Sequence, residues 1–136
     1  MKTFRVWLEG KAMKGWMLPT PENIALAKQF VFEKWKERAK EYGHEEPADL
    51  QSACKFASIF AQRIFGGQLR GNYDHQWVDL NGQVIDLADY IADDMENVYL
   101  HDRGFWGNKD HKESMASCEP RVARWVQEFK ARYKGA

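Results

Sequence analysis

The chain has 136 residues, of which 44% are hydrophobic, 14% aromatic and 29% charged, and its 20 basic and 20 acidic side chains cancel. This length predicts one domain, residues 1–136, with a single sizeable core. The aromatic content excludes a disordered chain, because such rings bury large apolar areas. No stretch approaches the ~18 apolar residues of a membrane span, and no apolar leader follows Met1. We therefore expect a cytoplasmic protein without a membrane partner.

Charge and cysteine content bear on the class of partner. Residues 1–43 carry nine basic and five acidic side chains, residues 44–120 carry six and 14, and residues 121–136 carry five and one. The basic ends would suit a nucleic-acid surface, although solvated helix faces explain them equally well. Cys54 and Cys118 are too few for a secreted disulfide scaffold, so we expect two reduced thiols.

The N-terminal part predicts a short strand followed by a long helix. Residues 3–8 alternate loosely, and residues 15–18 are the candidate partner strand. Thr20 then suits an N-cap and Pro21 the first helical position, which predicts a helix over residues 21–42. Gly43 is expected to end it.

A second helix is expected to begin near Asp49 or Ser52 and to end at Gly66. Its apolar side chains recur at helical spacing, and Cys54 lies on the shoulder of that stripe, close to the helix start. Unpaired backbone N–H groups and the positive end of the helix dipole stabilise a thiolate at this position.

Residues 73–87 predict a β-hairpin around Asn81-Gly82, the preferred pair for a two-residue type I′ turn. The turn sets a register that pairs Leu80 with Gln83. One face then carries Val78, Leu80, Ile85 and Leu87, and the other carries His75, Trp77, Asp79, Val84 and Asp86. His75 and Asp86 are diagonal neighbours in this register. A loop of odd length would reverse the faces.

The rest of the chain has weaker patterns. Residues 86–97 are acidic and read as partly helical, and residues 100–116 read as a polar and aromatic loop. A last helix is expected over residues 119–133, with Ser117 as its cap.

Cys54, His75 and Asp86 are the candidate catalytic residues. Thiol chemistry needs a thiolate, a base within hydrogen-bond reach and a group that orients the base. Each residue has a plain structural alternative: a buried apolar thiol, a structural histidine and a turn-capping carboxylate. The order along the chain, with the thiol at a helix start and the other two on one hairpin face, favours the chemical interpretation.

Four short segments resemble the core of papain-like and transglutaminase-like proteins, most closely small bacterial and phage members. They are Ser-Ala-Cys54-Lys-Phe-Ala-Ser, Phe65-Gly-Gly-Gln-Leu-Arg70, His75-Gln-Trp77 and Asn81-Gly-Gln-Val-Ile-Asp86-Leu. The resemblance covers about residues 50–90. It implies an α+β fold in which a helix carrying Cys54 packs on a small antiparallel sheet, with the 21–42 and 119–133 helices outside. It also implies that Cys54 is the nucleophile, His75 the base and Asp86 the orienting group.

The resemblance suggests further site residues and shows departures. Papain-like peptidases place a glutamine shortly before the cysteine to bind the oxyanion, and Gln51 is the candidate here; Asn72 and Gln76 are others. The spacing from cysteine to histidine is shorter than in the larger transglutaminases. Trp77, Phe105 and Trp106 are candidates for lining a substrate groove.

These observations predict a thiol hydrolase or acyl transferase that acts on an amide or thioester of a peptide or acyl substrate, without a cofactor. No metal is expected, because the polar residues that might gather around one lack a ligand spacing; they are His101, Asp102, His111, Glu113 and Cys118. The first alternative is an inactive interaction module on the same scaffold. The second is a nucleic-acid binder that uses the basic terminal helices.

Overall fold

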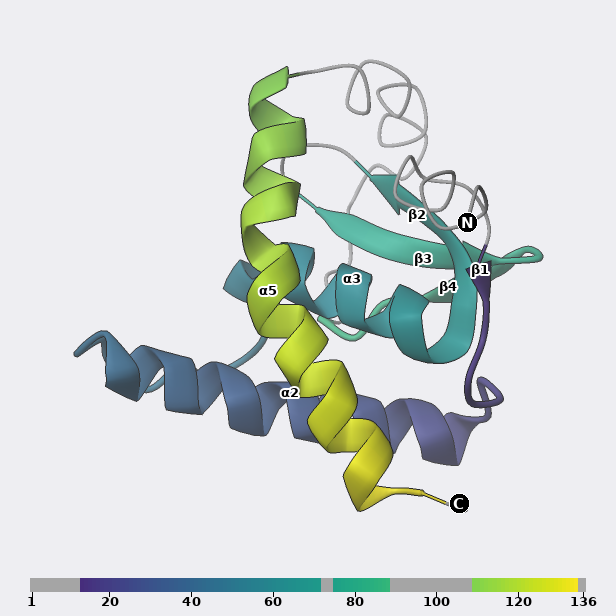
Figure 1. Ribbon diagram of the computed structural model, residues 1–136, viewed down its shortest axis with the longest axis horizontal. Coiled ribbons are helices and arrows are strands. Elements are labelled where there is room, and N and C mark those ends of the chain that lie inside the picture. Colours follow the sequence, from purple (N-terminus) through teal and green to yellow (C-terminus); the bar gives the residue numbers. More distant parts are fainter. Residues whose placement is uncertain (1–12, 72–74, 89–108, 135–136) are drawn as a thin grey trace.

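The computed structural model describes residues 13–71, 75–88 and 109–134, which form an α+β fold (Figure 1). The elements in chain order are β1 (Met13–Lys14), α2 (Pro21–Glu41), the short 3-10 helix η1 (Gln51–Ala53), α3 (Cys54–Phe65), β2 (Gly66–Gly71), β3 (Gln76–Leu80), β4 (Gln83–Ile85) and α5 (Lys109–Arg132). The strands form an antiparallel sheet in the order β1-β2-β3-β4. The predicted fold class, α+β with a small antiparallel sheet, is therefore confirmed.

Helix α3 is the central element of the packing. It contacts β2 and β3 on one side and the longer helices α2 and α5 on the other, so it lies between the sheet and those helices (Figure 1). Its sequence explains this position, because nine of its 12 residues are buried. A helix that is apolar over most of its surface must be covered on several sides.

Local sequence signals account for α2. The Thr20 hydroxyl oxygen accepts a hydrogen bond from the backbone N–H of Asn23 at 3.2 Å, and Pro21 occupies the first turn, where its missing N–H costs nothing. Gly43 follows the helix with φ of 72°, a left-handed conformation that glycine adopts without strain. The predicted helix over residues 21–42 is thus confirmed to within one residue.

The hairpin of β3 and β4 has the predicted register. Leu80 pairs with Gln83, and Val78 pairs with Ile85. Asn81 and Gly82 have φ of 52° and 91°, the two positive values that a type I′ turn requires. An even-length turn therefore sets which side chains share a face.

The first strand differs from the prediction. Met13 and Lys14 pair with Gly67 and Gly66, whereas residues 15–18 form no strand. The backbone N–H groups of Trp16 and Met17 instead donate to the carbonyl of Ile64. Residues 3–8, the other half of the predicted strand pair, lie outside the described residues, as do residues 89–97.

The last helix begins ten residues earlier than predicted, at Lys109 rather than at Glu119. Residues 109–116 are therefore helical and not part of a loop. Ser117 is not a cap, since it lies inside the helix and its hydroxyl donates to the carbonyl of Ser114. A continuous buried stripe explains the longer helix; its members are His111, Met115, Cys118, Val122, Trp125 and Phe129.

Three rings from three helices form the centre of the core. Phe30 of α2, Phe60 of α3 and Phe129 of α5 meet pairwise, with ring centroids 5.1–5.6 Å apart. Each of these rings is at most 1% exposed. This cluster fixes α3 relative to the two covering helices, and α3 carries Cys54.

Ion pairs connect the outer surfaces of α2 and α5. Arg132 pairs with Glu33, Arg121 with Glu41, and Lys34 with Glu128. Several basic side chains of the terminal helices are therefore matched by acidic groups of the opposite helix. In the described ranges, no helix has both the length and the apolar character needed to cross a membrane.

Candidate functional site

The candidate site lies where three elements begin or end. Cys54 is the first residue of α3, His75 directly precedes β3, and Asp86 directly follows β4. The hairpin turn brings the start of β3 and the end of β4 to the same end of the sheet, next to the amino end of α3 (Figure 1). Residues far apart along the chain thus become neighbours.

The three side chains form a continuous chain of polar contacts. Sγ of Cys54 lies 3.2 Å from Nδ1 of His75, and Nε2 of the same ring lies 2.6 Å from Oδ2 of Asp86. The other carboxylate oxygen, Oδ1, accepts the backbone N–H of Ala88 at 3.1 Å. One ring nitrogen therefore faces the sulfur while the other is held by a carboxylate that is itself anchored.

The positions of His75 and Asp86 explain how they reach Cys54. Val78 and Ile85 lie on the hairpin face that joins the core with α3, and they are 0% and 1% exposed. Strict strand alternation would direct His75 to the opposite face. His75 and Asp86 directly flank the strands, at the end of the sheet that adjoins the first residue of α3, and this position brings His75 to Cys54.

Gly71 allows the chain to pass close to His75. It ends β2 and pairs with Gln76, with φ of 139°. A Cβ atom at this position would collide with the backbone carbonyl of His75. A glycine is therefore required for the backbone approach that positions the histidine.

Trp77 packs against the histidine ring. The two rings are stacked, with centroids 5.3 Å apart and planes inclined by 25°. Trp77 is 1% exposed and His75 is 2% exposed, so the indole forms a buried support for the imidazole. The expectation that Trp77 lines a substrate groove stays a prediction. Phe105 and Trp106, the other groove candidates, lie outside the described residues.

The surroundings of His75 favour its protonated form. Burial alone acts to lower its pKa, but the hydrogen bonds to Asp86 and to Cys54 outweigh burial and raise the pKa from 6.5 to about 9. The imidazole is therefore a cation at neutral pH. A cation 3.2 Å from sulfur stabilises negative charge on that sulfur.

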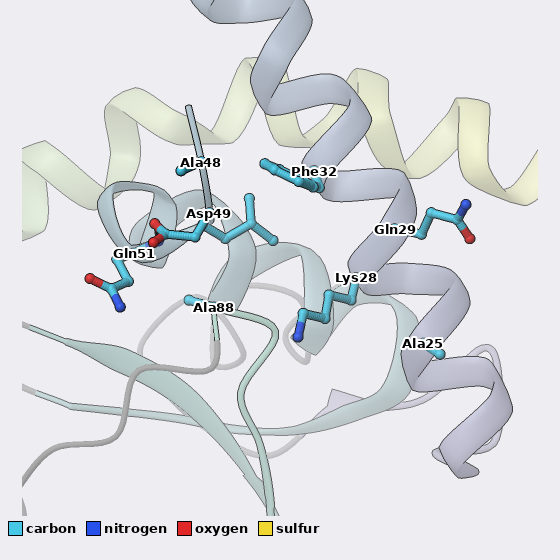
Figure 2. Close-up of a pocket in the computed structure, with 9 residues that line it drawn as sticks. Ala25, Lys28, Gln29, Phe32, Ala48, Asp49, Gln51 and Ala88 are labelled. Carbon is cyan, nitrogen blue, oxygen red and sulfur yellow. Dashed lines mark hydrogen bonds between the residues drawn. The ribbon is translucent and has the colours of Figure 1, made fainter. Parts of the chain in front are cut away.

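Gln51 contacts the sulfur through its backbone. Sγ of Cys54 lies 2.9 Å from the Gln51 carbonyl oxygen, which can only accept a hydrogen bond. The exposed Gln51 side chain lines a neighbouring pocket (Figure 2). Its role as an oxyanion donor stays a prediction. Gln76 is 3% exposed, and Asn72 lies outside the described residues.

A pocket beside this site was not anticipated from the sequence. It has a volume of about 480 Å³ and lies between α2 and the segment that leads into α3 (Figure 2). Its lining comprises Ala25, Lys28, Gln29, Phe32, Ala48, Asp49, Leu50, Gln51 and Ala88. The sequence of α2 gave no sign of this pocket, because polar residues on the exposed side of a helix usually face solvent rather than line a pocket.

The residues weighed as metal ligands do not assemble in the part of the chain that is described, where no three His, Cys, Asp or Glu side chains form such a group. His111 is buried in α5, and burial together with the charge of Lys55 lowers its pKa to about 4. Burial raises the pKa of the Cys118 thiol. His101 and Asp102 lie outside the described residues.

The arrangement as a whole can perform proton transfer to and from a thiol. It provides a sulfur atom at a helix start, an imidazole within hydrogen-bond distance and a carboxylate that fixes the ring. We compared the chain with protein family models, curated proteins and solved structures, and none of them matched it.

Proposed function

We propose that the protein is a thiol hydrolase or acyl transferase that acts on an amide or thioester through Cys54, His75 and Asp86, on a papain-like or transglutaminase-like core. The observation that carries the proposal is the pair of contacts at His75, 3.2 Å to the thiol and 2.6 Å to the carboxylate. A thiol, an imidazole and a carboxylate in consecutive contact support the roles of nucleophile, base and orienting group, because such chemistry depends on this geometry.

The first half of the reaction forms an acyl enzyme. The imidazole of His75 is already protonated at neutral pH, so it holds the proton at Nδ1 while the Cys54 sulfur attacks the carbonyl carbon of the substrate to form a C–S bond. The bond to the leaving amine or thiol then breaks, and the imidazolium protonates the leaving group. Asp86 holds the ring and balances its charge throughout, so that the ring need not reorient between the two proton transfers.

The second half releases the acyl group. Water, or an acceptor amine in a transferase, gives a proton to His75 as it attacks the thioester carbon. The C–S bond breaks, and the sulfur leaves beside the protonated His75, which restores the starting state. The products are a carboxylic acid or a new amide together with the regenerated protein, so atoms and charge balance without an oxidant or a cofactor.

Site-resolved alkylation tests the proposed nucleophile. Iodoacetamide should modify Cys54 rapidly at pH 6, well below the ~8.5 at which an ordinary thiol ionises. Cys118 is an internal control, because it is also buried, at 4% exposure, and its pKa is raised. Peptide mass spectrometry of the native protein reports both rates, and His75→Gln should abolish the difference.

Acylation then tests the reaction. Incubation with p-nitrophenyl acetate should add one acetyl group to Cys54 in the wild-type protein and none in Cys54→Ser or His75→Gln. Equal, slow modification of Cys54 and Cys118 together with no acetylation would contradict the proposal. That outcome would favour the non-enzymatic interaction module. The low exposure of Cys54, 5%, is the observation that supports this alternative, because a substrate must reach the thiol.

A further inference from the structure

The pocket beside the site has a mainly apolar wall. Five of its nine lining residues are Ala, Leu or Phe; they are Ala25, Phe32, Ala48, Leu50 and Ala88. Leu50 and Ala88 are 3% and 4% exposed, and Phe32 is a half-buried ring that packs against the core. The volume of about 480 Å³ falls within the usual range for small-ligand sites, roughly 300–1,000 Å³. A small ligand with apolar surface would therefore bury that surface here.

The polar residues of the lining offer a ligand few groups to bind. Gln29 is directed away from the pocket, and the carboxylate of Asp49 is turned toward Gln51, whose backbone N–H donates to Oδ1 at 3.0 Å (Figure 2). Lys28 already has an interaction partner, and its methylene stem adds apolar surface. Burying a charged ligand group without a partner is costly, so the ligand that fits this lining is uncharged and apolar.

Two residues of the lining are hydrogen-bonded to the candidate site. The Gln51 carbonyl lies 2.9 Å from Sγ of Cys54, and the Ala88 N–H donates to Asp86 at 3.1 Å. Both Gln51 and Ala88 line the pocket. The backbone that positions the nucleophile and the orienting carboxylate is therefore also a wall of the pocket, and a substrate group bonded to the sulfur lies next to this wall.

We propose that this pocket holds the acyl group of the substrate, an uncharged hydrocarbon chain of medium length. The placement beside the sulfur rests on the proposed function, whereas the affinity of the pocket for such a chain does not. The acyl group stays bonded to the sulfur between the two half-reactions, and the leaving group departs after the first. A pocket that shares a wall with the sulfur therefore stabilises an acyl enzyme with a longer chain more than one with an acetyl group. Each methylene group buried there should increase affinity about fourfold.

Binding is measured in Cys54→Ser protein, so that the result does not depend on the thiol. The probes are ethanol, n-butanol and n-hexanol, which are uncharged and differ in chain length alone, in titrations followed by amide resonances of the ¹⁵N-labelled protein. The longest probe, n-hexanol, should shift the resonances of the pocket-lining residues. It should also bind about tenfold more tightly than n-butanol, because it buries two more methylene groups.

Acylation measures the same preference in the wild-type protein. The p-nitrophenyl esters of acetic, butanoic and hexanoic acid are compared by the second-order rate of acylation of Cys54. Each rate is divided by the rate of the same ester with N-acetylcysteine, which corrects for the intrinsic reactivity of the ester. The relative rate should rise on the order of tenfold from acetate to butanoate, and by a similar factor from butanoate to hexanoate.

Two variants of Phe32 test the wall itself. Both lose the contact of the ring with the Lys36 ammonium group, 4.3 Å from the ring centroid, so the difference between them reports the polarity of the wall. Phe32→Leu should keep the preference for hexanoate, and Phe32→Asn should reduce it about tenfold, with acetate nearly unaffected in both. Tyr42→Ala removes an exposed ring at the end of the same helix, outside the lining, and should behave as the parent protein does.

The proposal is overturned if n-hexanol shifts no resonance of the pocket at about 10 mM, or if acetate and hexanoate have equal relative rates. It is also overturned if Phe32→Asn keeps the full preference for hexanoate. Melting temperatures establish that each variant folds, and Phe32→Thr replaces Phe32→Asn if the latter does not. If no ester acylates Cys54 while n-hexanol binds at the pocket, the proposed function fails and the affinity for apolar chains stands, so the two failures are distinguishable.

Discussion

Nδ1 of His75 lies 3.2 Å from Sγ of Cys54, although 21 positions of the chain separate the two residues. Helix α3 and strand β2 fill that interval, and the carboxylate of Asp86 holds the far side of the ring at 2.6 Å. Because His75 contacts both the thiol and the carboxylate, several expected outcomes depend on the charge of its imidazole.

The histidine should titrate with a midpoint at about pH 9, in contrast to the usual 6.5. Imidazole proton and carbon resonances followed between pH 5 and 10 would report the midpoint directly. A midpoint near 6.5 would show that the hydrogen bonds to Asp86 and Cys54 do not persist in solution.

The same titration should make stability depend on pH. The folded protein holds this proton more tightly than the unfolded chain, so the stabilisation is complete below pH ~6.5 and disappears as the pH rises through about 9. The loss should be on the order of 3 kcal/mol, since the ring is 2% exposed and little screened. Urea unfolding at pH 6 and pH 9 measures it, and the difference attributable to this group should be absent in His75→Gln.

Asp86→Asn should lower the pKa of His75 and slow alkylation of Cys54 at pH 7 by about tenfold or more. The substitution removes the charge that stabilises the imidazolium, while the burial that lowers the pKa remains. Asp79→Asn is the matched control, because Asp79 accepts the turn N–H of Gly82, beside the hairpin turn and at the opposite end of β3 from His75. An unchanged alkylation rate in Asp86→Asn would remove the orienting role assigned to the carboxylate.

Gly71→Ala should disturb the histidine more than the fold as a whole. The new methyl group would meet the His75 carbonyl at a backbone φ of 139°, so both collision and strain oppose it. We expect a loss of about 2 kcal/mol or more in the free energy of unfolding and slower alkylation of Cys54. Gly82→Ala separates the two causes: it has a φ of 91° with open space around it, and should cost only about 1 kcal/mol of strain, with alkylation unchanged.

Phe129→Ala should lower the free energy of unfolding by about 3–5 kcal/mol, because it opens a cavity between rings from three helices. Calorimetry or urea unfolding measures the loss. Val84→Ala is the comparison, since Val84 is 46% exposed and should change stability by less than about 1 kcal/mol. Similar losses in the two variants would show that the ring cluster does not dominate the core.

The hairpin was predictable because its information is local. Two residues, Asn81 and Gly82, need positive φ, and that requirement alone sets the register and hence the proximity of His75 to Asp86. The start of α2 was predictable for the same reason, since Thr20 and Pro21 are short-range signals. Contacts between hairpin and helix are tertiary, and the sequence suggested that Cys54 would meet His75 only through the order of the three residues along the chain and through the resemblance.

The start of α5 was missed because residues 100–116 were interpreted as a polar and aromatic loop and Ser117 as the cap of the last helix. Pro120 lies in the interior of α5, where burial of the stripe on both sides outweighs the missing N–H. That buried stripe includes His111 and Cys118, which the sequence analysis had weighed as metal-ligand candidates rather than as core residues. The pocket depends on how the side of α2 faces the segment before α3, which no pattern within either segment encodes.

Cys54, His75 and Asp86 lie within 33 consecutive residues, and neither α2 nor α5 contributes a member. Assembly of the three groups thus closes only short loops, for which the entropic cost is small and the folding rate is high. Helices α2 and α5 supply none of the three groups and instead bury α3, which carries Cys54. A change in either helix should therefore reach the candidate site only through the packing of α3.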